Sequence, residues 1–175
     1  GLTPGLREVG ERFDNGDYPL PYVVVAANAM KAAVDLVKGK MTGSQKPKFF
    51  GTGVIGVVYG DIHSIGKDVV NVLLEVNGYK MYDLGTEVPV EQFIKKAEEV
   101  GADFIGAGAM MTTTMPYMKV LVDTLVERGL RDKYKVIVGG AQMTEGFAES
   151  TGADGYGADA SDTIQKLKVM LAERA

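Results

Sequence analysis

From residue 49 onward, short apolar runs alternate with segments of helical periodicity, and this alternation is the feature that most constrains the fold. The apolar runs predict strands over residues 54–59, 79–84, 103–109, 134–138 and 153–156. The intervening segments predict helices over 67–76, 90–100, 116–128 and 144–150, with a last helix from about residue 162. Strands that alternate with helices form a parallel sheet with helices on both faces. We therefore expect an α/β fold with a flavodoxin-like, doubly wound, five-stranded parallel sheet of order 2-1-3-4-5.

Residues 1–45 show a different pattern, and we expect them to form a small helical cap before a main domain at 46–175. A first helix is predicted to end at Asn15-Gly16, and Pro21 is predicted to open a second one. Both helices carry a wide apolar stripe, which two helices cannot bury alone. We expect this stripe to cover another part of the protein or to belong to a larger helical bundle.

The composition excludes several classes of protein. The chain has no cysteine, which excludes disulfides, thiolate nucleophiles and cysteine-based metal sites. Its formal net charge is −4 and it has no basic cluster, so nucleic acid is not expected as a partner. We find no signal peptide and no apolar run near the roughly 20 residues that cross a membrane, so we expect no membrane contact and a cytoplasmic location. With a single histidine, any metal is expected to arrive within a cofactor.

The stretch GDIHSIG, at residues 60–66, contains that histidine, His63, two positions after Asp61. It directly follows the first predicted strand. In a doubly wound sheet of this order, ligands bind beyond the carboxyl ends of the strands, where the strand order reverses. The segments that follow the other central strands, 110–115 and 139–141, should reach the same edge. The topology therefore predicts a site that includes the histidine.

Other interpretations of these motifs remain open. A single histidine in a loop is more often incidental than a ligand, although the Asp-x-His spacing can place a carboxylate behind one ring nitrogen. The hydroxyl cluster at 112–114 is equally consistent with a cap for the helix that begins at Pro116. Gly139-Gly140 is consistent with an ordinary turn or with the close approach of a flat group. The G-x-G-x-x-G string at 51–56 lies before or within a strand, so we interpret it as a false dinucleotide match.

The spacing of the motifs resembles a known family. Asp61-x-His63-x-x-Gly66, followed by residues 108–114 and a Gly-Gly pair, is similar to the D-x-H-x-x-G … S-x-L … G-G pattern of cobalamin-binding domains. Residues 6–37 resemble the helical cap of methionine synthase and of the small corrinoid proteins that serve anaerobic demethylation of methylamines, methanol or methoxy-aromatic compounds.

This sequence departs from the family pattern in two places. Gly108 stands where the pattern has serine, and Met110 stands where it has leucine. The serine hydroxyl contacts the nucleotide tail of the cofactor in the family, so its loss puts one hydrogen bond to the tail in doubt. The family cap has about four helices, and we expect the cap in this chain to be incomplete.

The resemblance implies a methyl carrier. Cobalamin or a related corrinoid, methylcobalamin in the loaded state, would carry a methyl group on its cobalt from a substrate:corrinoid methyltransferase to a corrinoid:acceptor methyltransferase. A reductive activation protein would be a third partner. Alternatives are a cobalamin-dependent regulator or sensor, a cobalamin-binding fragment of a larger enzyme such as methionine synthase, and a flavodoxin-like domain that binds a flavin or nothing.

The resemblance also assigns roles to residues. His63 would be the lower axial ligand of cobalt in place of the cofactor's own base (base-off, His-on), and Asp61 and Thr114 would complete a relay behind it. Phe13 and Leu20 would cover the methyl group on the upper face. The other positions expected to bind the cofactor or its tail are Gly60, Ile62, Ser64, Ile65, Gly66, Gly108, Met110, Thr112, Gly139, Gly140, Tyr156, Gly157, Ala158 and Asp159.

Overall fold

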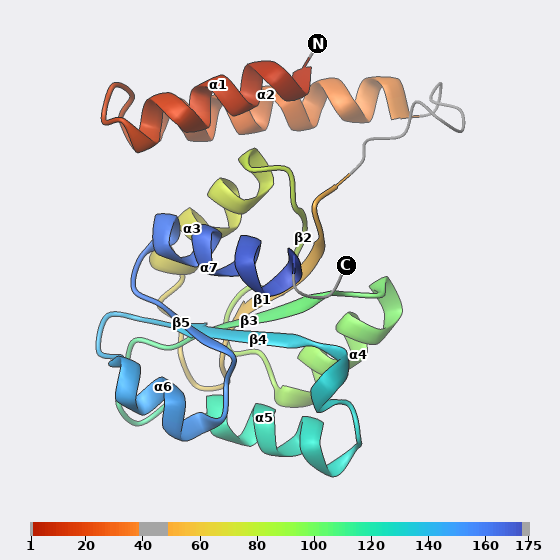
Figure 1. The fold of residues 1–175 in the computed structure, drawn as a ribbon, viewed down its shortest axis with the longest axis vertical. Coiled ribbons are helices and arrows are strands. Elements are labelled where there is room, and N and C mark those ends of the chain that lie inside the picture. Colours follow the sequence, from red (N-terminus) through yellow and green to blue (C-terminus); the bar gives the residue numbers. More distant parts are fainter. Residues whose placement is uncertain (1, 39–48, 173–175) are drawn as a thin grey trace.

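The computed structural model describes residues 2–38 and 49–172 of the 175-residue chain (Figure 1). A helical hairpin comes first, followed by an α/β domain. The elements, in chain order, are α1 (Leu2–Asp14), α2 (Leu20–Lys38), β1 (Thr52–Val57), α3 (Ile65–Val76), β2 (Lys80–Asp83), α4 (Val90–Val100), β3 (Phe104–Gly108), α5 (Pro116–Glu127), the 3-10 turn η2 (Arg131–Lys133), β4 (Lys135–Gly139), α6 (Glu145–Thr151), β5 (Gly155–Gly157) and α7 (Ala160–Ala172).

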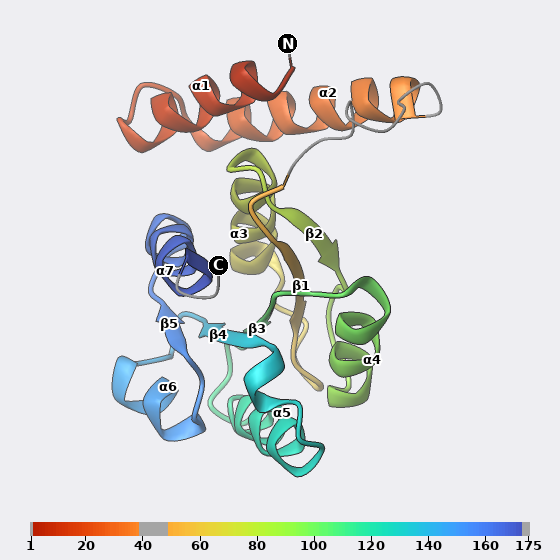
Figure 2. The same ribbon diagram turned by 45° about the vertical axis from the view of Figure 1, so that its right-hand side comes forward.

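The described strands form one parallel sheet of five strands in the order β2-β1-β3-β4-β5. Helices α3 and α7 cover one face, and α4, α5 and α6 cover the other (Figures 1 and 2). The α/β class and the strand order predicted from the sequence are confirmed.

Each face of the sheet has its own apolar core because strand residues alternate between faces. On β3, Ile105 packs with residues of α4 and α5, whereas Phe104 packs with residues of α3 and α7. The predicted strands lie within two residues of the observed ones. The last strand begins at Gly155, directly after Asp154, whose carboxylate accepts a hydrogen bond from the Val136 N–H at 2.8 Å, at the start of β4.

The helical hairpin packs on the end of α3. Leu6 of α1 and Val23 and Ala27 of α2 are buried in the same cluster as Val76, the last residue of α3. A side chain at Gly10 would come within 3.2 Å of Val76, so the small residue allows α1 to approach α3 closely. The apolar stripe of the hairpin is therefore partly covered by the α/β domain. The predicted boundary between residues 45 and 46 lies outside the described residues.

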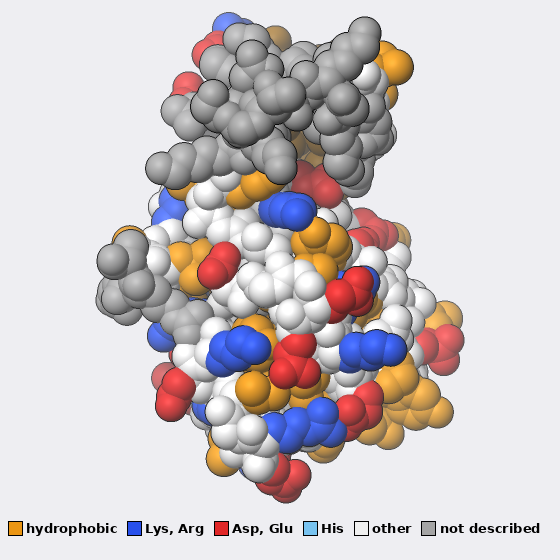
Figure 3. Space-filling view, turned by 90° about the vertical axis from the view of Figure 1, so that its right-hand side faces the viewer, with side chains coloured by type: hydrophobic (Ala, Val, Ile, Leu, Met, Phe, Trp, Pro, Cys, Tyr) orange, Lys and Arg blue, Asp and Glu red, His pale blue; other side chains and the backbone are white. Residues whose placement is uncertain are grey.

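Part of α2 faces away from this contact. Tyr22, Val25 and Leu36 are exposed apolar side chains on it. None of the helices in the described part of the chain is long and apolar enough to span a membrane. On the face shown in Figure 3, lysine and arginine side chains are interspersed with aspartate and glutamate, and no large region of one sign is visible.

The glycine-rich string at 51–56 has a packing role. Gly53 and Gly56 lie within β1, and α3 begins only at Ile65. A side chain at Gly53 would overlap the Phe104 ring, and one at Gly56 would come within 2.9 Å of the Phe93 ring. These glycines let aromatic rings pack directly on the sheet, which agrees with the interpretation of the string as a false dinucleotide match.

Candidate functional site

A tight turn after β1 presents His63 at the carboxyl edge of the sheet. Gly60 supports the turn with a φ of 78°, a conformation that glycine adopts without strain. The carboxylate of Asp61 then accepts a hydrogen bond from the backbone N–H of His63 at 3.0 Å. This local bond is the Asx turn typical of aspartate in loops. The same carboxylate oxygen lies 2.8 Å from Nδ1 of the His63 ring.

Asp61 has no exposed surface, and its carboxylate accepts hydrogen bonds from several donors. Besides the two from His63, its Oδ2 accepts from the N–H groups of Met110 at 2.7 Å and Met111 at 3.1 Å. The Thr114 hydroxyl donates to Oδ2 at 2.7 Å. Burial would raise the pKa of this carboxyl, but the hydrogen bonds, with that from Thr114 foremost, hold the pKa well below its usual range.

The ionised Asp61 fixes the form of the histidine ring. A carboxylate can only accept, so the proton of a neutral imidazole must reside on Nδ1, next to Asp61. Nε2 then keeps its lone pair, and among the described residues no hydrogen bond to it is found. The His63 side chain is 43% exposed, so this nitrogen is available to a ligand or metal. An imidazole supported by a carboxylate in this way is a common metal ligand.

Thr114 does not cap the following helix, which was one of the two interpretations of the hydroxyl cluster. The N-cap of α5 is Met115, and no side chain caps it. The Thr114 hydroxyl lies 2.7 Å from Asp61 and 2.9 Å from the carbonyl oxygen of Met111. It has one proton, and the charged carboxylate is the stronger acceptor. Thr112 and Thr113 are exposed.

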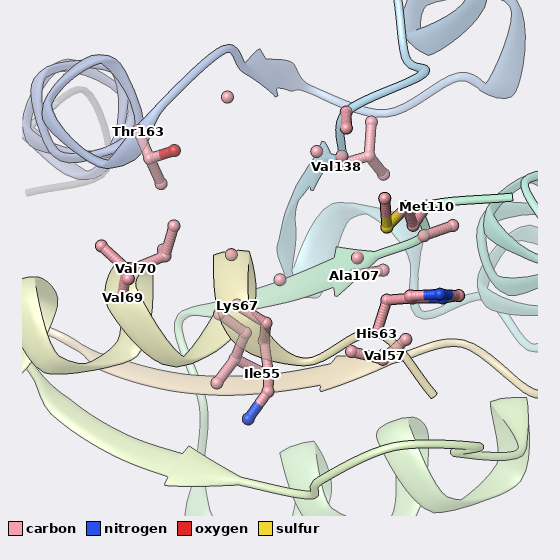
Figure 4. Close-up of a pocket in the computed structure, with 18 of the residues that line it drawn as sticks. Ile55, Val57, His63, Lys67, Val69, Val70, Ala107, Met110, Val138 and Thr163 are labelled. Carbon is pink, nitrogen blue, oxygen red and sulfur yellow. The ribbon is translucent and has the colours of Figure 1, made fainter. Parts of the chain in front are cut away.

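Beside His63, a cavity of about 770 Å³ lies between the sheet, α3 and α7 (Figure 4). Val69 and Val70 of α3 and Thr163 of α7 lie toward one end of the cavity, and His63 and Met110 lie toward the other. A volume of this size is typical of sites for small molecules and cofactors. Among the described residues, no cluster of three or more His, Cys, Asp or Glu side chains could hold a bare metal ion.

The cavity exists because glycines meet in register across the sheet. Gly108 of β3 pairs with Gly139 of β4, which pairs with Gly157 of β5. A side chain at Gly139 would come within 2.9 Å of the Gly157 carbonyl oxygen, and one at Gly157 would overlap the Thr163 hydroxyl. Gly140 has a φ of 149°, and a side chain there would overlap the Ala109 carbonyl oxygen. Gly139, Gly140 and Gly157 therefore leave no room for a side chain.

The structure brings most of the predicted residues to this cavity, and those that line it are Ile62, His63, Ser64, Ile65, Gly66, Gly108, Met110, Gly139, Gly140, Gly157, Ala158 and Asp159. Asp61 and Thr114 lie behind His63. Tyr156 lies outside the lining, and its hydroxyl donates to the Met143 carbonyl oxygen at 3.1 Å. Gly60 and Thr112 are also outside the lining.

The two cap residues lie elsewhere. Phe13 packs against the apolar cluster that joins the hairpin to α3, and neither Phe13 nor Leu20 is among the residues that line the cavity. The cavity opens at the His63 loop, which precedes the first turn of α3, whereas the hairpin contacts the last turn.

Sequence reasoning missed the cavity walls, which are Ile55, Val57, Lys67, Val69, Val70, Gly106, Ala107, Ala109, Ile137, Val138, Ala141, Ala160 and Thr163. Some of these residues could have been predicted from periodicity. Gly106 lies two positions before Gly108 on β3 and therefore faces the same side. Val69 and Val70 lie three and four positions after Gly66 on α3. No sequence pattern marked Thr163.

Comparison with known proteins identifies the family. A model described as a B12 binding domain matches residues 51–165, and a second model with the same description matches residues 1–38. The chain belongs to the B12-binding family. It is 45% identical to the dimethylamine corrinoid protein of Methanosarcina barkeri over 98% of this chain and 81% of that protein. It is 44% identical to trimethylamine corrinoid protein 1 of Methanosarcina acetivorans, over 98% and 80% respectively.

Solved structures of B12-binding proteins agree with this assignment. A chain of the methanol:cobalamin methyltransferase complex of M. barkeri superimposes with a TM-score of 0.89 at 33% identity, over 98% of this chain and 65% of that one. The monomethylamine corrinoid protein of M. barkeri gives a TM-score of 0.65 at 32% identity, over 99% and 80% respectively.

The cofactor of this B12-binding chain is therefore cobalamin or a related corrinoid, and the residues present fit one. His63 offers an imidazole nitrogen at the mouth of the cavity, with its tautomer fixed from behind by Asp61. The glycine positions leave an apolar slot on the sheet, where a flat group can approach the backbone.

Proposed function

We propose that this chain carries a methyl group between two methyltransferases on a corrinoid bound base-off and His-on. When bound, the corrinoid supplies a cobalt centre that accepts a methyl group from a donor and delivers it to an acceptor. The observation on which the proposal rests is the position of His63, whose Nε2 stands at the mouth of the apolar cavity while Nδ1 is held by the buried Asp61.

In this proposal His63 would hold the cobalt through Nε2, and the cavity would receive the nucleotide tail that the histidine displaces. Asp61 keeps the Nδ1 proton in place, which orients the ring and strengthens the donor character of Nε2. Thr114 donates to Asp61 and keeps the carboxylate ionised. A proton added to Nε2 would block ligation, so this relay sets how firmly the cobalt is held.

Partner proteins would supply the sites for methyl donor and acceptor. The relatives named above are a dimethylamine and a trimethylamine corrinoid protein, which favours a methylated amine as the donor. One solved relative is a complex between a corrinoid chain and a methyltransferase for methanol, which supports direct docking of such an enzyme. A reductive activation protein would return the cofactor to its active state after adventitious oxidation.

Phe13 and Leu20 would cover the methyl group only in another arrangement of the hairpin. Here the hairpin packs on the last turn of α3, at the opposite end of that helix from the His63 loop. A cover formed by these residues requires the hairpin to leave this contact and reach the mouth of the cavity.

The presence of one histidine makes a direct test of ligation possible. The chain is produced with ¹⁵N-labelled histidine, loaded with cobalamin and reduced to the paramagnetic Co(II) state for electron paramagnetic resonance. We expect the splitting from the axial nitrogen to change from the ¹⁴N to the ¹⁵N pattern. A ¹⁴N pattern that persists would mean that the cofactor keeps its own base, which would rule out His-on binding.

Methyl transfer is tested separately. The loaded chain is mixed with a methylamine:corrinoid methyltransferase and ¹⁴C-labelled dimethylamine or trimethylamine, and the label on the corrinoid is counted. We expect labelling with the wild-type chain and a large loss with His63→Ala. No labelling with any methylated amine, methanol or methoxy-aromatic donor and its methyltransferase would contradict the carrier role.

A further inference from the structure

Gly108 differs from the other strand-end glycines that line the cavity, which are Gly139, Gly140 and Gly157. Side chains at Gly139, Gly140 and Gly157 are excluded by the protein's own atoms. At Gly108, an added Cβ would meet no atom closer than 3.8 Å, the Gly56 carbonyl oxygen, and its backbone is not in the left-handed region. Packing therefore does not require a glycine at position 108, and the space next to this residue is part of the cavity.

The cavity offers no free side-chain donor around this space. Polar side chains in the lining are His63, Ser64, Lys67, Asp159 and Thr163. The Ser64 hydroxyl donates to Asp68 at 2.7 Å, and the Thr163 hydroxyl donates to the Asp159 carbonyl oxygen at 2.7 Å. The Lys67 ammonium pairs with Asp83, and in Figure 4 it points away from the cavity.

The remaining polar groups do not supply a side-chain donor either. His63 Nδ1 is held by Asp61, and Nε2 is the nitrogen assigned to cobalt. Asp159 can only accept, and it already accepts from the Asp162 N–H at 2.8 Å. The carbonyl oxygens of Gly108 and Gly139 accept from the N–H groups of Val58 and Ala109, at 2.9 and 3.1 Å. A group that enters the slot therefore meets an apolar surface with no hydroxyl or ammonium directed at it.

We propose that Gly108 sets the selectivity of this slot for the lower base of the corrinoid, a conclusion that rests on the base-off binding proposed above. Without a side-chain donor, the slot recognises a flat base by its shape and apolar surface. It accepts a phenol-type base, which has no ring nitrogen, as readily as a benzimidazole.

The test measures binding, not activity. Corrinoids with a dimethylbenzimidazole or a cresol base are titrated into the full chain, and dissociation constants are obtained from the change in absorption. For the wild type we expect the benzimidazole and cresol forms to bind within about threefold of each other.

Two substitutions at one position separate the hydroxyl from the added volume. Gly108→Ser adds a donor, and we expect it to favour the benzimidazole form over the cresol form by roughly threefold to tenfold, as one neutral hydrogen bond allows. Gly108→Ala adds the carbon alone and should leave that ratio unchanged. The open space at position 108 allows both variants to fold, which a thermal melt checks.

The outcomes separate this inference from the proposed function. If the wild type binds the benzimidazole and cresol forms with dissociation constants that differ by more than about tenfold, the role of Gly108 is overturned. The same holds if G108S and G108A have equal ratios of the two dissociation constants. If the labelled-histidine spectrum shows His63 on cobalt, either result overturns the role of Gly108 and leaves the proposed function in place. Failure of both corrinoids to bind, or absence of the histidine signal, would overturn the proposed function and the inference with it.

Discussion

The Thr114 hydroxyl lies 2.7 Å from Oδ2 of Asp61, although 53 positions separate the two residues in the sequence. Asp61 follows β1 and Thr114 follows β3, which are neighbours in the sheet. The other oxygen of the same carboxylate holds the His63 ring. The orientation of the histidine therefore depends on a contact between two turns at the carboxyl edge of the sheet.

Thr114→Val should destabilise the chain. Valine has the same shape but removes one donor from a buried carboxylate, so we expect a loss of about 1–3 kcal/mol in the free energy of unfolding, measured with urea. Thr114→Ser keeps the hydroxyl and should lose less. Thr113→Val, at an exposed position next door, should stay within about 0.5 kcal/mol of the wild type. Equal stability of Thr114→Val and Thr113→Val would contradict the contact.

Stability should fall in acid in a way that depends on Asp61. Its pKa is lower in the folded chain than the 3.8 of the free side chain, so the unfolded state binds the proton first as the pH falls. The contribution of Asp61 is complete above that value and is lost as the pH falls below it toward the folded pKa. We expect the urea midpoint of Asp61→Asn to change less than that of the wild type below about pH 4. Parallel pH profiles would show that other carboxyls account for the acid sensitivity.

Lys67 and Asp83 should show strong coupling. The Lys67 side chain is only 4% exposed, and it forms ion pairs with Asp83 and with the more exposed Asp68. Asp83→Ala leaves a buried ammonium with one partner and should cost about 2–3 kcal/mol. Lys67→Met on the Asp83→Ala background should restore part of that loss, because no buried charge remains. Additive effects in this double-mutant cycle, measured by urea unfolding, would show that the pair is not coupled.

Gly140→Ala should be far more damaging than Gly108→Ala. At Gly140 the φ of 149° and the overlap with the Ala109 carbonyl oxygen require the backbone to move, so we expect a loss above about 3 kcal/mol or a failure to fold. Gly108→Ala should stay within about 1 kcal/mol, since its Cβ meets only ordinary contacts. Thermal melts of the two variants make the comparison. Similar melting temperatures would contradict the close contact between position 140 and the Ala109 carbonyl oxygen.

Glu87 offers a stabilising substitution. It is the one non-glycine residue with positive φ in the described part of the chain, at 53°, and its N–H donates to the Asp61 carbonyl oxygen at 3.1 Å. Glu87→Gly relieves the backbone and should raise stability by up to about 1 kcal/mol. Glu87→Val should lower it by about 1–2 kcal/mol, because a β-branched residue is poorly tolerated there. A melting temperature that rises with valine would exclude this explanation.

Much of the fold follows from periodicity, and the site follows only in part. The alternation of apolar runs and helical segments predicts a parallel sheet with helices on both faces, and the flavodoxin-like fold supplies its strand order. The Asp-x-His spacing predicts a carboxylate behind His63. The N–H donors of Met110 and Met111 could not be predicted, because they depend on the turn after β3 and not on side-chain type. The position of the hairpin was likewise inaccessible, since an apolar stripe shows that a helix is covered but not what covers it.

The carboxylate of Asp61 also bears on the order of events during folding. Its long-range donors lie 49 to 53 positions further along the chain, so they reach it only after β1 and β3 have paired. Contacts between distant segments form late, because the loop between them must first close. Until β1 and β3 have paired, only the local contacts between Asp61 and His63 can orient the imidazole, and the support from Met110, Met111 and Thr114 is added when the centre of the sheet is complete.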